Sequence, residues 1–400
     1  MRPTAVQFPR VIVVSGLGIV QILAFGTTYY LPAVLAGPIV ADTGWPISLV
    51  IGGFSLGLLT AGLVSPFVGR EIARRGGRAV LSSSSVLIGL GLALMGAAPS
   101  LPVFLVSWVV VGLGMGGGLY DATFSTLGRL YGREARGAIA VVTLWGGFAS
   151  TVCWPLSTFL LDAVGWRETC FVYAALHVCL AMPFQLVLLS GASRAEPQAP
   201  DEATETATAS VDLRDHVSTI LLISAVVTVS GSIASMVSVH LLALLHAQGV
   251  GPETAVGIGA LIGPAQVLAR LAEMAIGRRT HPIWSMLASV SLIALGMVVL
   301  LAGPTVAAVA LVLYGAGNGA ISIAKGTLPL TLFGPFHYAM VMGRIARPAL
   351  IAQALAPSLA AALIGAAGAG SLLPILAILG AIDVGLALAL KARIGRAPRP

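Results

Sequence analysis

One polar run divides this sequence into two hydrophobic blocks. It covers Ser190–His216, is rich in Ala, Thr, Pro and Glu, and contains no aromatic residue. Such a segment buries too little apolar surface to offset its own ordering entropy, so we interpret it as a solvated linker. The blocks on either side, residues 1–189 and 217–400, are each long enough for several membrane spans. An interdomain spacer in a soluble protein is the alternative, and the hydrophobicity of both blocks argues against it.

Charged residues are too few to cover a water-facing surface. They make up 9% of the 400 residues, while hydrophobic residues make up 57% and the mean hydropathy is +0.97. Soluble chains carry roughly 25% charged residues. The 48 glycines and 23 prolines suit membrane helices, where they permit close packing and tolerated kinks. We therefore expect a protein that crosses the membrane many times.

The positions of the basic residues, cysteines and histidines argue against several other classes of protein. The net charge is +7, but the basic residues form short clusters between apolar runs, as membrane topology requires, so we predict no nucleic-acid partner. The three cysteines lie in apolar segments without CxxC spacing, and the six histidines are scattered, so we predict neither a disulfide framework nor a metal site. No Walker loop and no nucleophile–base pattern is present, so we expect no cofactor and no enzyme activity.

At about 20 residues per span, the two blocks hold six predicted helices each. The helices before the linker are expected at about 11–36, 46–68, 79–98, 102–126, 137–161 and 168–189. Those after it are expected at about 217–246, 254–276, 283–302, 305–330, 339–367 and 371–390. The first run is read as a retained span, because a cleaved signal peptide has a shorter apolar core. The predicted fold is an all-α membrane protein of twelve helices in two six-helix bundles.

The basic residues predict the orientation of these spans. With the N-terminus inside, 19 of the 22 Lys and Arg residues fall in inner segments, and only Arg167 falls in an outer loop. Arg270 and Lys325 lie within spans. Because cytoplasmic loops carry an excess of Lys and Arg, we expect both termini and the linker to be cytoplasmic, in a cell (inner) membrane.

The two halves also share a weak internal repeat. Matching residues are separated by nearly constant offsets of roughly 201 to 208 positions, as parallel repeats require. The matches are Gly112, Gly114 and Gly116 with Gly315, Gly317 and Gly319; Ala138 and Pro155 with Ala339 and Pro357; and Gly69-Arg70 with Gly277-Arg278. Chance matching of common residues is the alternative. The constancy of the offset favours two pseudo-symmetric halves.

Six spans, a linker and six more spans resemble the major facilitator superfamily over essentially the whole chain. The loop after the second span, Gly69-Arg-Glu-Ile-Ala73-Arg74-Arg-Gly76-Gly-Arg78, is similar to that family's G-x-x-x-D-R-x-G-x-R loop. The resemblance implies that Gly69, Arg74, Gly76 and Arg78 form a cytoplasmic latch. Ala73 occupies the position where the motif has its acid. Asp121, near the inner end of the fourth span, could pair with Arg74 or Arg78 instead.

A second resemblance is to the monocarboxylate and oxalate–formate branch. It is carried by Tyr131–Ala140 at the entry to the fifth span and by Arg270 in the eighth, which matches an arginine that binds substrate carboxylate in that branch. The multidrug antiporter motif requires Gly-Pro late in the fifth span. Here Ser150-Thr151-Val152 stands in that place, which argues against a drug antiporter.

Ionisable residues within spans are the main candidates for function, because each costs roughly 2.5–3.5 kcal/mol at a helix centre. The guanidinium of Arg270 can hold a carboxylate through two parallel hydrogen bonds. The alternative is an ion pair with Glu273, three residues further along the same helix. Lys325 could bind substrate or couple charge to occupancy. Its alternative role is to extend to the inner interface.

Further residues complete the predicted site. Glu273 and Asp121 are candidate proton carriers, although Asp121 is also a candidate for the latch. Tyr29 and Tyr30 would form an aromatic and hydroxyl wall, unless they belong to an interfacial belt. Asn318 could donate a hydrogen bond to substrate or bridge helices. Asp383 lies in the twelfth span, which the resemblance places at the periphery, so we expect no functional role for it.

The sequence thus predicts a monomeric secondary transporter of a small organic anion, working by alternating access in symport with protons or in anion exchange. Its expected partners are the small-molecule substrate and the lipid bilayer. Two alternatives stay open. One is a proton-driven exporter of amphipathic or cationic compounds, and the other is a transporter-like sensor that moves no solute.

Overall fold

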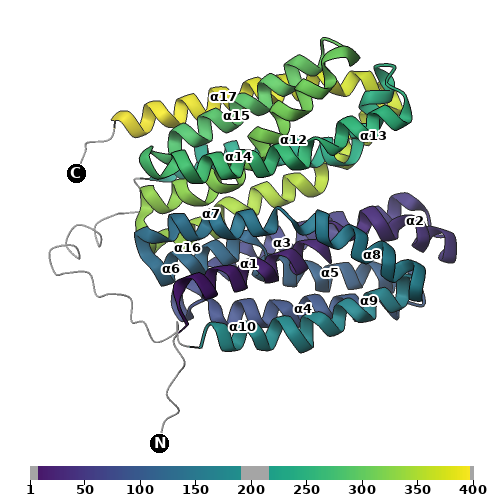
Figure 1. Ribbon diagram of the computed structural model, residues 1–400, viewed down its shortest axis with the longest axis horizontal. Coiled ribbons are helices and arrows are strands. Elements are labelled where there is room, and N and C mark those ends of the chain that lie inside the picture. Colours follow the sequence, from purple (N-terminus) through teal and green to yellow (C-terminus); the bar gives the residue numbers. More distant parts are fainter. Residues whose placement is uncertain (1–7, 191–215, 397–400) are drawn as a thin grey trace, which may run out of the picture. The chain divides into compact units, whose positions relative to one another are not determined.

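The computed structural model describes residues 8–190 and 216–396 (Figure 1). Most of the expected linker, residues 191–215, lies outside the described residues. The chain divides into two compact units. Unit 1 comprises Met1–Ser210 and Phe333–Arg347, and unit 2 comprises Val211–Leu332 and Pro348–Pro400. This division follows the two hydrophobic blocks except for Phe333–Arg347, which belongs to the second block in sequence and to unit 1 in space.

The described part of the first block is helical throughout. Its helices are α1 (Arg10–Gly26), α2 (Leu31–Thr43), α3 (Ile47–Arg75), α4 (Gly77–Gly96), α5 (Leu101–Gly118), α6 (Tyr120–Tyr131), η1 (Gly132–Glu134), α7 (Ala135–Gly146), α8 (Ala149–Val164), α9 (Trp166–Ala175), the π-helical turn η2 (Leu176–Ala181) and α10 (Met182–Leu188).

The second block is built in the same way. Its helices are α12 (Val217–Ala247), α13 (Pro252–Ala260), α14 (Ile262–Ile276), η4 (Gly277–Arg279), α15 (Pro282–Leu300), η5 (Pro304–Val306), α16 (Ala307–Ala367), η6 (Ala369–Ser371) and α17 (Leu372–Arg396).

Ten helical segments within the described residues are long and apolar enough to cross a membrane. Two of them, Leu101–Val164 and Pro304–Ala367, contain 64 residues each, about three times the length that a single span needs. The expectation of an all-α protein with many membrane-spanning helices is therefore confirmed. The number twelve stays a prediction, because each of these long segments covers two of the expected spans.

Several expected spans are interrupted where local chemistry competes with the helix. The first span consists of α1 and α2, separated by a turn at residues 27–30. Thr27 and Thr28 each direct their hydroxyl to the carbonyl four residues earlier, at 2.8 and 2.6 Å, and Pro32 lies in the first turn of α2. Hydroxyl bonds to the i−4 carbonyl bend helices, and proline is well tolerated in a first turn.

Glycine triplets set the helix spacing in the same way in both halves. A Cβ atom added to Gly112 would lie 2.4 Å from the Gly57 carbonyl oxygen of α3, and one on Gly114 would meet Ile88 of α4 at 2.6 Å. In the second half the corresponding atoms would meet the Ile262 carbonyl oxygen of α14 at 2.9 Å, from Gly315, and the Ser289 carbonyl oxygen of α15 at 2.5 Å, from Gly317. Small residues allow this close approach of membrane helices. The repeat seen in sequence therefore corresponds to a repeated packing arrangement.

Helix α16 joins the tenth and eleventh expected spans without an intervening loop. Only Gly334 departs from helical geometry, with φ 66° and ψ 169°. The region of positive φ and extended ψ is essentially restricted to glycine. Gly334 therefore marks the change of direction between two helices that the backbone otherwise runs together.

Candidate functional site

Arg270 is a buried cation in α14 that uses only part of its hydrogen-bonding capacity. The residue is 6% exposed, and its Nη2 donates a long hydrogen bond of 3.4 Å to Oε1 of Gln266, one turn earlier. Its Nε and Nη1 are buried and have no hydrogen-bond partner among the described residues. A guanidinium cannot be deprotonated in a protein, so it cannot lower the cost of burial by losing its charge. The geometry therefore leaves two buried donors available to an anion.

Glu273 lies one turn from Arg270, but the two side chains extend in opposite directions along α14. Oε1 of Glu273 accepts a hydrogen bond of 2.7 Å from Ser285 of α15. The same oxygen lies so close to Gly277 that a Cβ there would be 2.4 Å away, whereas Arg270 reaches back toward Gln266. The i,i+3 ion pair considered as the alternative is thus not made through Nε or Nη1 of Arg270.

The other two predicted residues of the second half, Asn318 and Lys325, lie on α16 and are half-buried. Asn318 lies between Gly317 and Gly319, and a Cβ on Gly319 would be 2.4 Å from the carbonyl oxygen of Gln266. This close approach brings α16 against the turn of α14 that contains Gln266, the residue to which Arg270 donates its hydrogen bond. The backbone carbonyl of Asn318 accepts a hydrogen bond of 3.0 Å from Ser322 within the helix. Helices α14 and α16 thus hold these predicted residues within one half of the chain.

Tyr29 and Tyr30 belong to a cluster of aromatic rings in unit 1. Tyr29 contacts Tyr30 at 5.6 Å and Phe54 of α3 at 5.1 Å between ring centroids, both edge to face. Tyr30 contacts Trp154 of α8 at 6.1 Å, and Phe54 contacts Trp108 of α5 at 5.9 Å. Edge-to-face contacts at these distances are favourable. The two tyrosines therefore form part of a continuous aromatic wall, whose Trp and Phe members we had not predicted.

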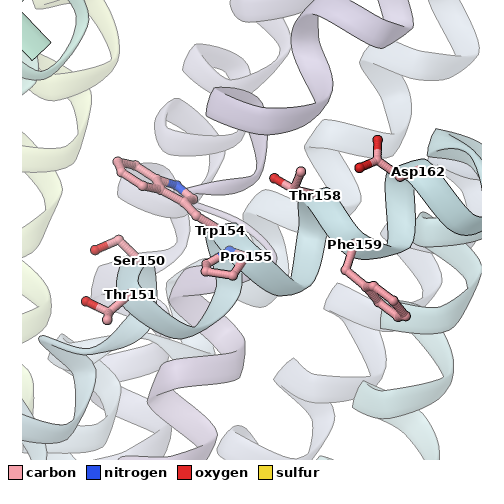
Figure 2. Close-up of a pocket in the computed structure, with 7 residues that line it drawn as sticks. All are labelled: Ser150, Thr151, Trp154, Pro155, Thr158, Phe159 and Asp162. Carbon is pink, nitrogen blue, oxygen red and sulfur yellow. The ribbon is translucent and has the colours of Figure 1, made fainter.

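Helix α8 borders a shallow hollow, wide open at the surface, that the sequence did not predict. It has a volume of about 650 Å³ and is lined by Ser150, Thr151, Trp154, Pro155, Thr158, Phe159 and Asp162 (Figure 2). Four of these residues, Ser150, Trp154, Thr158 and Asp162, recur every fourth position and so share one face of the helix. This four-residue spacing was the feature of the sequence that could have identified the hollow.

The predicted latch residues lie where α3 and α4 meet. Gly76, with φ 83°, ends α3, and Arg74 and Arg78 are exposed. Arg78 donates from Nε to the Leu186 carbonyl oxygen at 3.0 Å. Arg129 of α6 donates to the carbonyl oxygens of Ile72 and Ala73, so a basic side chain reaches the backbone at the position where the family motif has its acid.

Gly69 and Gly343 are the points of closest approach between α3 and the Phe333–Arg347 segment within unit 1. A Cβ on Gly69 would lie 2.3 Å from the Ala339 carbonyl oxygen, and one on Gly343 would lie 2.5 Å from the Ser65 carbonyl oxygen. The Tyr338 ring packs on Gly128 of α6 in the same way. Asp121, at the start of α6, interacts electrostatically with Tyr338. The structure thus places Asp121 and Gly69 against one segment, whether or not they act as a latch.

Comparisons with known proteins agree with this architecture. The structure resembles that of the human organic anion transporter MFSD10 (TETRAN), with a TM-score of 0.73 and 18% sequence identity over 95% of this chain and 100% of that chain, and at this identity the likeness shows the fold alone. The chain is 30% identical over 209 residues to the uncharacterized MFS-type transporter YhjX of Escherichia coli K12, covering 51% of this chain and 50% of YhjX. It is 26% identical over 191 residues to the transcription regulatory protein OpdE of Pseudomonas aeruginosa PAO1, covering 46% of each.

The chain thus spans about half the length of the curated relatives it matches. The family model of the Major Facilitator Superfamily covers a longer stretch, residues 17–346, which includes the glycine triplets of both halves. Together with the helical architecture, this match confirms the resemblance that the loop after the second span indicated. This chain belongs to the Major Facilitator Superfamily.

Proposed function

We propose that this chain is a secondary active transporter of a small organic anion of the carboxylate class. The observation that carries the proposal is the buried guanidinium of Arg270, with two donors that no described residue uses. A carboxylate matches the planar fork of a guanidinium, whose parallel donor pairs are Nε with Nη2 and Nη1 with Nη2, so it would bind one of the open donors together with the second hydrogen of Nη2. Occupancy would then remove the cost of an uncompensated charge in the membrane.

The other residues have supporting roles in this proposal. Lys325 and Asn318 of α16 would add a second positive charge and an amide to the Arg270 site. Glu273 and Asp121 are proposed as proton carriers if transport is proton-coupled, and anion exchange is the other mode. Tyr29 and Tyr30 would contact substrate from the aromatic wall of the first half. Twelve spans, both termini in the cytoplasm, an inner-membrane location and a monomeric state complete the proposal.

The test is ligand-dependent thermal stability of the purified full chain in detergent. Oxalate, formate and lactate are added at equal ionic strength, with chloride as the reference salt. A ligand that binds only the folded state stabilises it by about 2.7 kcal/mol at 100 times its dissociation constant. We expect at least one carboxylate to raise the unfolding temperature of the wild type but not of Arg270→Lys, which keeps the charge and loses the fork.

Arg279→Lys is the matched control, because Arg279 is exposed in η4 after the end of the same helix. It should behave like the wild type. A carboxylate shift of full size in Arg270→Lys would contradict the proposal, as would the absence of any shift across the panel in the wild type.

A second candidate is an exporter of amphipathic cations, favoured by the hollow on α8. Trp154 and Phe159 offer apolar and aromatic surface, and Asp162 offers a negative charge. Cations bind well over aromatic faces beside a carboxylate. Tetraphenylphosphonium in the same assay separates the two candidates. Stabilisation by this cation that Asp162→Asn abolishes would favour the exporter.

The third candidate, a sensor that moves no solute, is favoured by the similarity to OpdE, which is named a transcription regulatory protein. Counterflow in proteoliposomes of any solute that stabilises the protein would exclude this function. Binding without counterflow would support it.

A further inference from the structure

In each half of the chain, a buried titratable side chain from the last expected span contacts a hydroxyl group of the first expected span. In the first half, Thr27 Oγ1 and His177 Nε2 are 2.8 Å apart. In the second half, Ser230 Oγ donates to Asp383 Oδ2 at 2.5 Å. Both His177 and Asp383 have an exposed fraction of 0%. Neither pair is used by the proposed anion site.

These pairs occupy equivalent positions of the internal repeat. Thr27 and Ser230 are 203 positions apart, and His177 and Asp383 are 206 positions apart. The glycine triplets that pack equivalently in the two halves are also 203 positions apart. Each pair also joins equivalent parts of its half, the first expected span and the last one. A chance match in sequence would not reproduce the same contact in both halves, so the pairs are one feature of the repeat.

The hydrogens at the first pair can be assigned by counting donors. The Thr27 hydroxyl donates its one hydrogen to the Leu23 carbonyl oxygen at 2.8 Å. It therefore accepts from His177, and Nε2 carries the ring hydrogen of the neutral imidazole. Nδ1 is left as a buried atom without a hydrogen-bond partner among the described residues. His177 also lies in the π-helical turn Leu176–Ala181, and such turns occur frequently at functional sites.

The second pair has the same form with an acid in place of a base. Ser230 donates a hydrogen bond to Asp383 Oδ2, while Oδ1 is buried and has no hydrogen-bond partner among the described residues. An ionised carboxylate needs a counter-charge or several donors at such a place. Oδ1 of Asp383 therefore lacks the partner that an ionised carboxylate would need there.

Among the described residues of α12, α15 and η6, which pack against α17, no charged group contacts Asp383. Helix α17 packs against α12 and α15, beside which it runs in Figure 1, and α15 contains no charged residue. On α12, His240 contacts the Pro357 carbonyl oxygen at 2.9 Å, and His216 and His246 lie at its two ends, roughly 20 Å or more from Ser230 at the helical rise of 1.5 Å per residue.

Two basic residues further along α17, Lys391 and Arg393, are directed elsewhere. Lys391 Nζ lies 3.8 Å from the centre of the Trp284 ring, and Arg393 Nε donates to Thr219 Oγ1 at 3.1 Å. The η6 turn, which also contacts α17, has no titratable side chain. The environment of Asp383 thus supplies one hydroxyl and no described cation.

We propose that Asp383 is a proton-binding site of this protein, with Ser230 as its hydrogen-bond donor and the His177–Thr27 pair as its counterpart in the first half. The proton is held on Oδ1, which makes the buried group neutral. On release the O–H bond breaks, its electron pair stays on the carboxylate, and the proton passes to water. The site needs no organic anion, so it stands independently of the proposed substrate.

The direct test is infrared spectroscopy of the purified full chain, which detects the C=O stretch of a protonated carboxyl group. At about pH 6 exposed aspartates, with an ordinary pKa of about 3.9, are ionised and do not contribute to this band. We expect the wild type to show the band and Asp383→Asn to lose it. Asn resembles the neutral acid in shape and should be tolerated. Asp42→Asn, at a half-exposed carboxyl, should keep the band.

Ser230→Ala provides a second measurement that does not require the Asp383 variant to fold. Removing the hydroxyl that donates to Oδ2 should shift the frequency of the band without abolishing it. The proposal is overturned if the folded wild type has no band that depends on Asp383, or if Ser230→Ala leaves the frequency unchanged.

Discussion

Arg270 and Asp383 show two ways in which a membrane protein can tolerate a buried ionisable group. Both are buried in the second half, and each has hydrogen-bonding atoms without a partner among the described residues. Arginine keeps its charge under all ordinary conditions, so only a partner can compensate it. Aspartic acid can become neutral by taking up a proton. The same shortage of partners is therefore the basis for proposing an anion at one residue and a proton at the other.

A single methyl group at Gly69 should be destabilising. The added Cβ would lie 2.3 Å from the Ala339 carbonyl oxygen, a backbone atom that cannot move by itself. Overpacking of this kind typically costs about 1–3 kcal/mol. We expect Gly69→Ala to lower the midpoint of thermal unfolding in detergent. Gly52→Ala on the same helix, where nothing lies within 4 Å, is the control and should not lower it. Equal effects of the two substitutions would contradict the packing described for Gly69.

At the scale of elements, the interruptions within helices matter as much as the helices. The turn between α1 and α2 places Tyr29 and Tyr30 in the aromatic wall, which a straight helix through residues 11–36 would not do. Helix α16 shows the opposite case, because two expected spans are joined with only Gly334 between them. Proline, glycine and hydroxyl side chains at these points decide which faces of the helices meet.

Gly334 provides a test of this description of α16. At φ 66° and ψ 169° an alanine would be strained, at a cost of about 1–3 kcal/mol, although no atom obstructs its Cβ. Gly365 lies in the same helix, also has open space around it and has helical geometry. Gly365→Ala should be neutral or stabilising by up to about 1 kcal/mol.

The two unfolding midpoints, measured side by side in detergent, isolate the backbone contribution at Gly334. A Gly334→Ala protein as stable as Gly365→Ala would show that this glycine is helical in solution and that the change of direction lies elsewhere.

At the scale of the whole molecule, the distribution of basic residues is a prediction about topology. Helix α15 is a convenient test because it is short and has an expected inner end near Thr280 and an expected outer end near Ala302. A membrane-impermeant maleimide applied to intact cells should label Ala302→Cys and not Thr280→Cys. Permeabilised cells should allow labelling of both, because Thr280 follows the basic pair at the cytoplasmic side.

The background for this experiment should lack Cys179, which is exposed, while Cys153 and Cys170 are buried. Labelling of Thr280→Cys alone in intact cells would reverse the orientation. Labelling of both sites in intact cells would mean that α15 does not cross the membrane.

Hydropathy and charge along the chain were sufficient to predict the class of protein and the all-helical fold. These are properties of segments, since a run of about 20 apolar residues has few alternatives to a membrane helix. The internal repeat was also visible in sequence through its glycines. The helix breaks at residues 27–30 and 119, and the continuity of α16, were not predicted, because the hydropathy of a segment does not specify the backbone geometry at single residues within it.

The partners of the polar side chains were decided only by the tertiary structure. Thr27 meets His177 and Ser230 meets Asp383 across about 150 residues of sequence in each half, and Arg270 is directed to Gln266 instead of Glu273. A residue's identity determines its charge and its hydrogen-bonding atoms. Which of those atoms find a partner depends on how helices far apart in the chain are rotated and spaced against each other, and that is determined by the packing of all of them together.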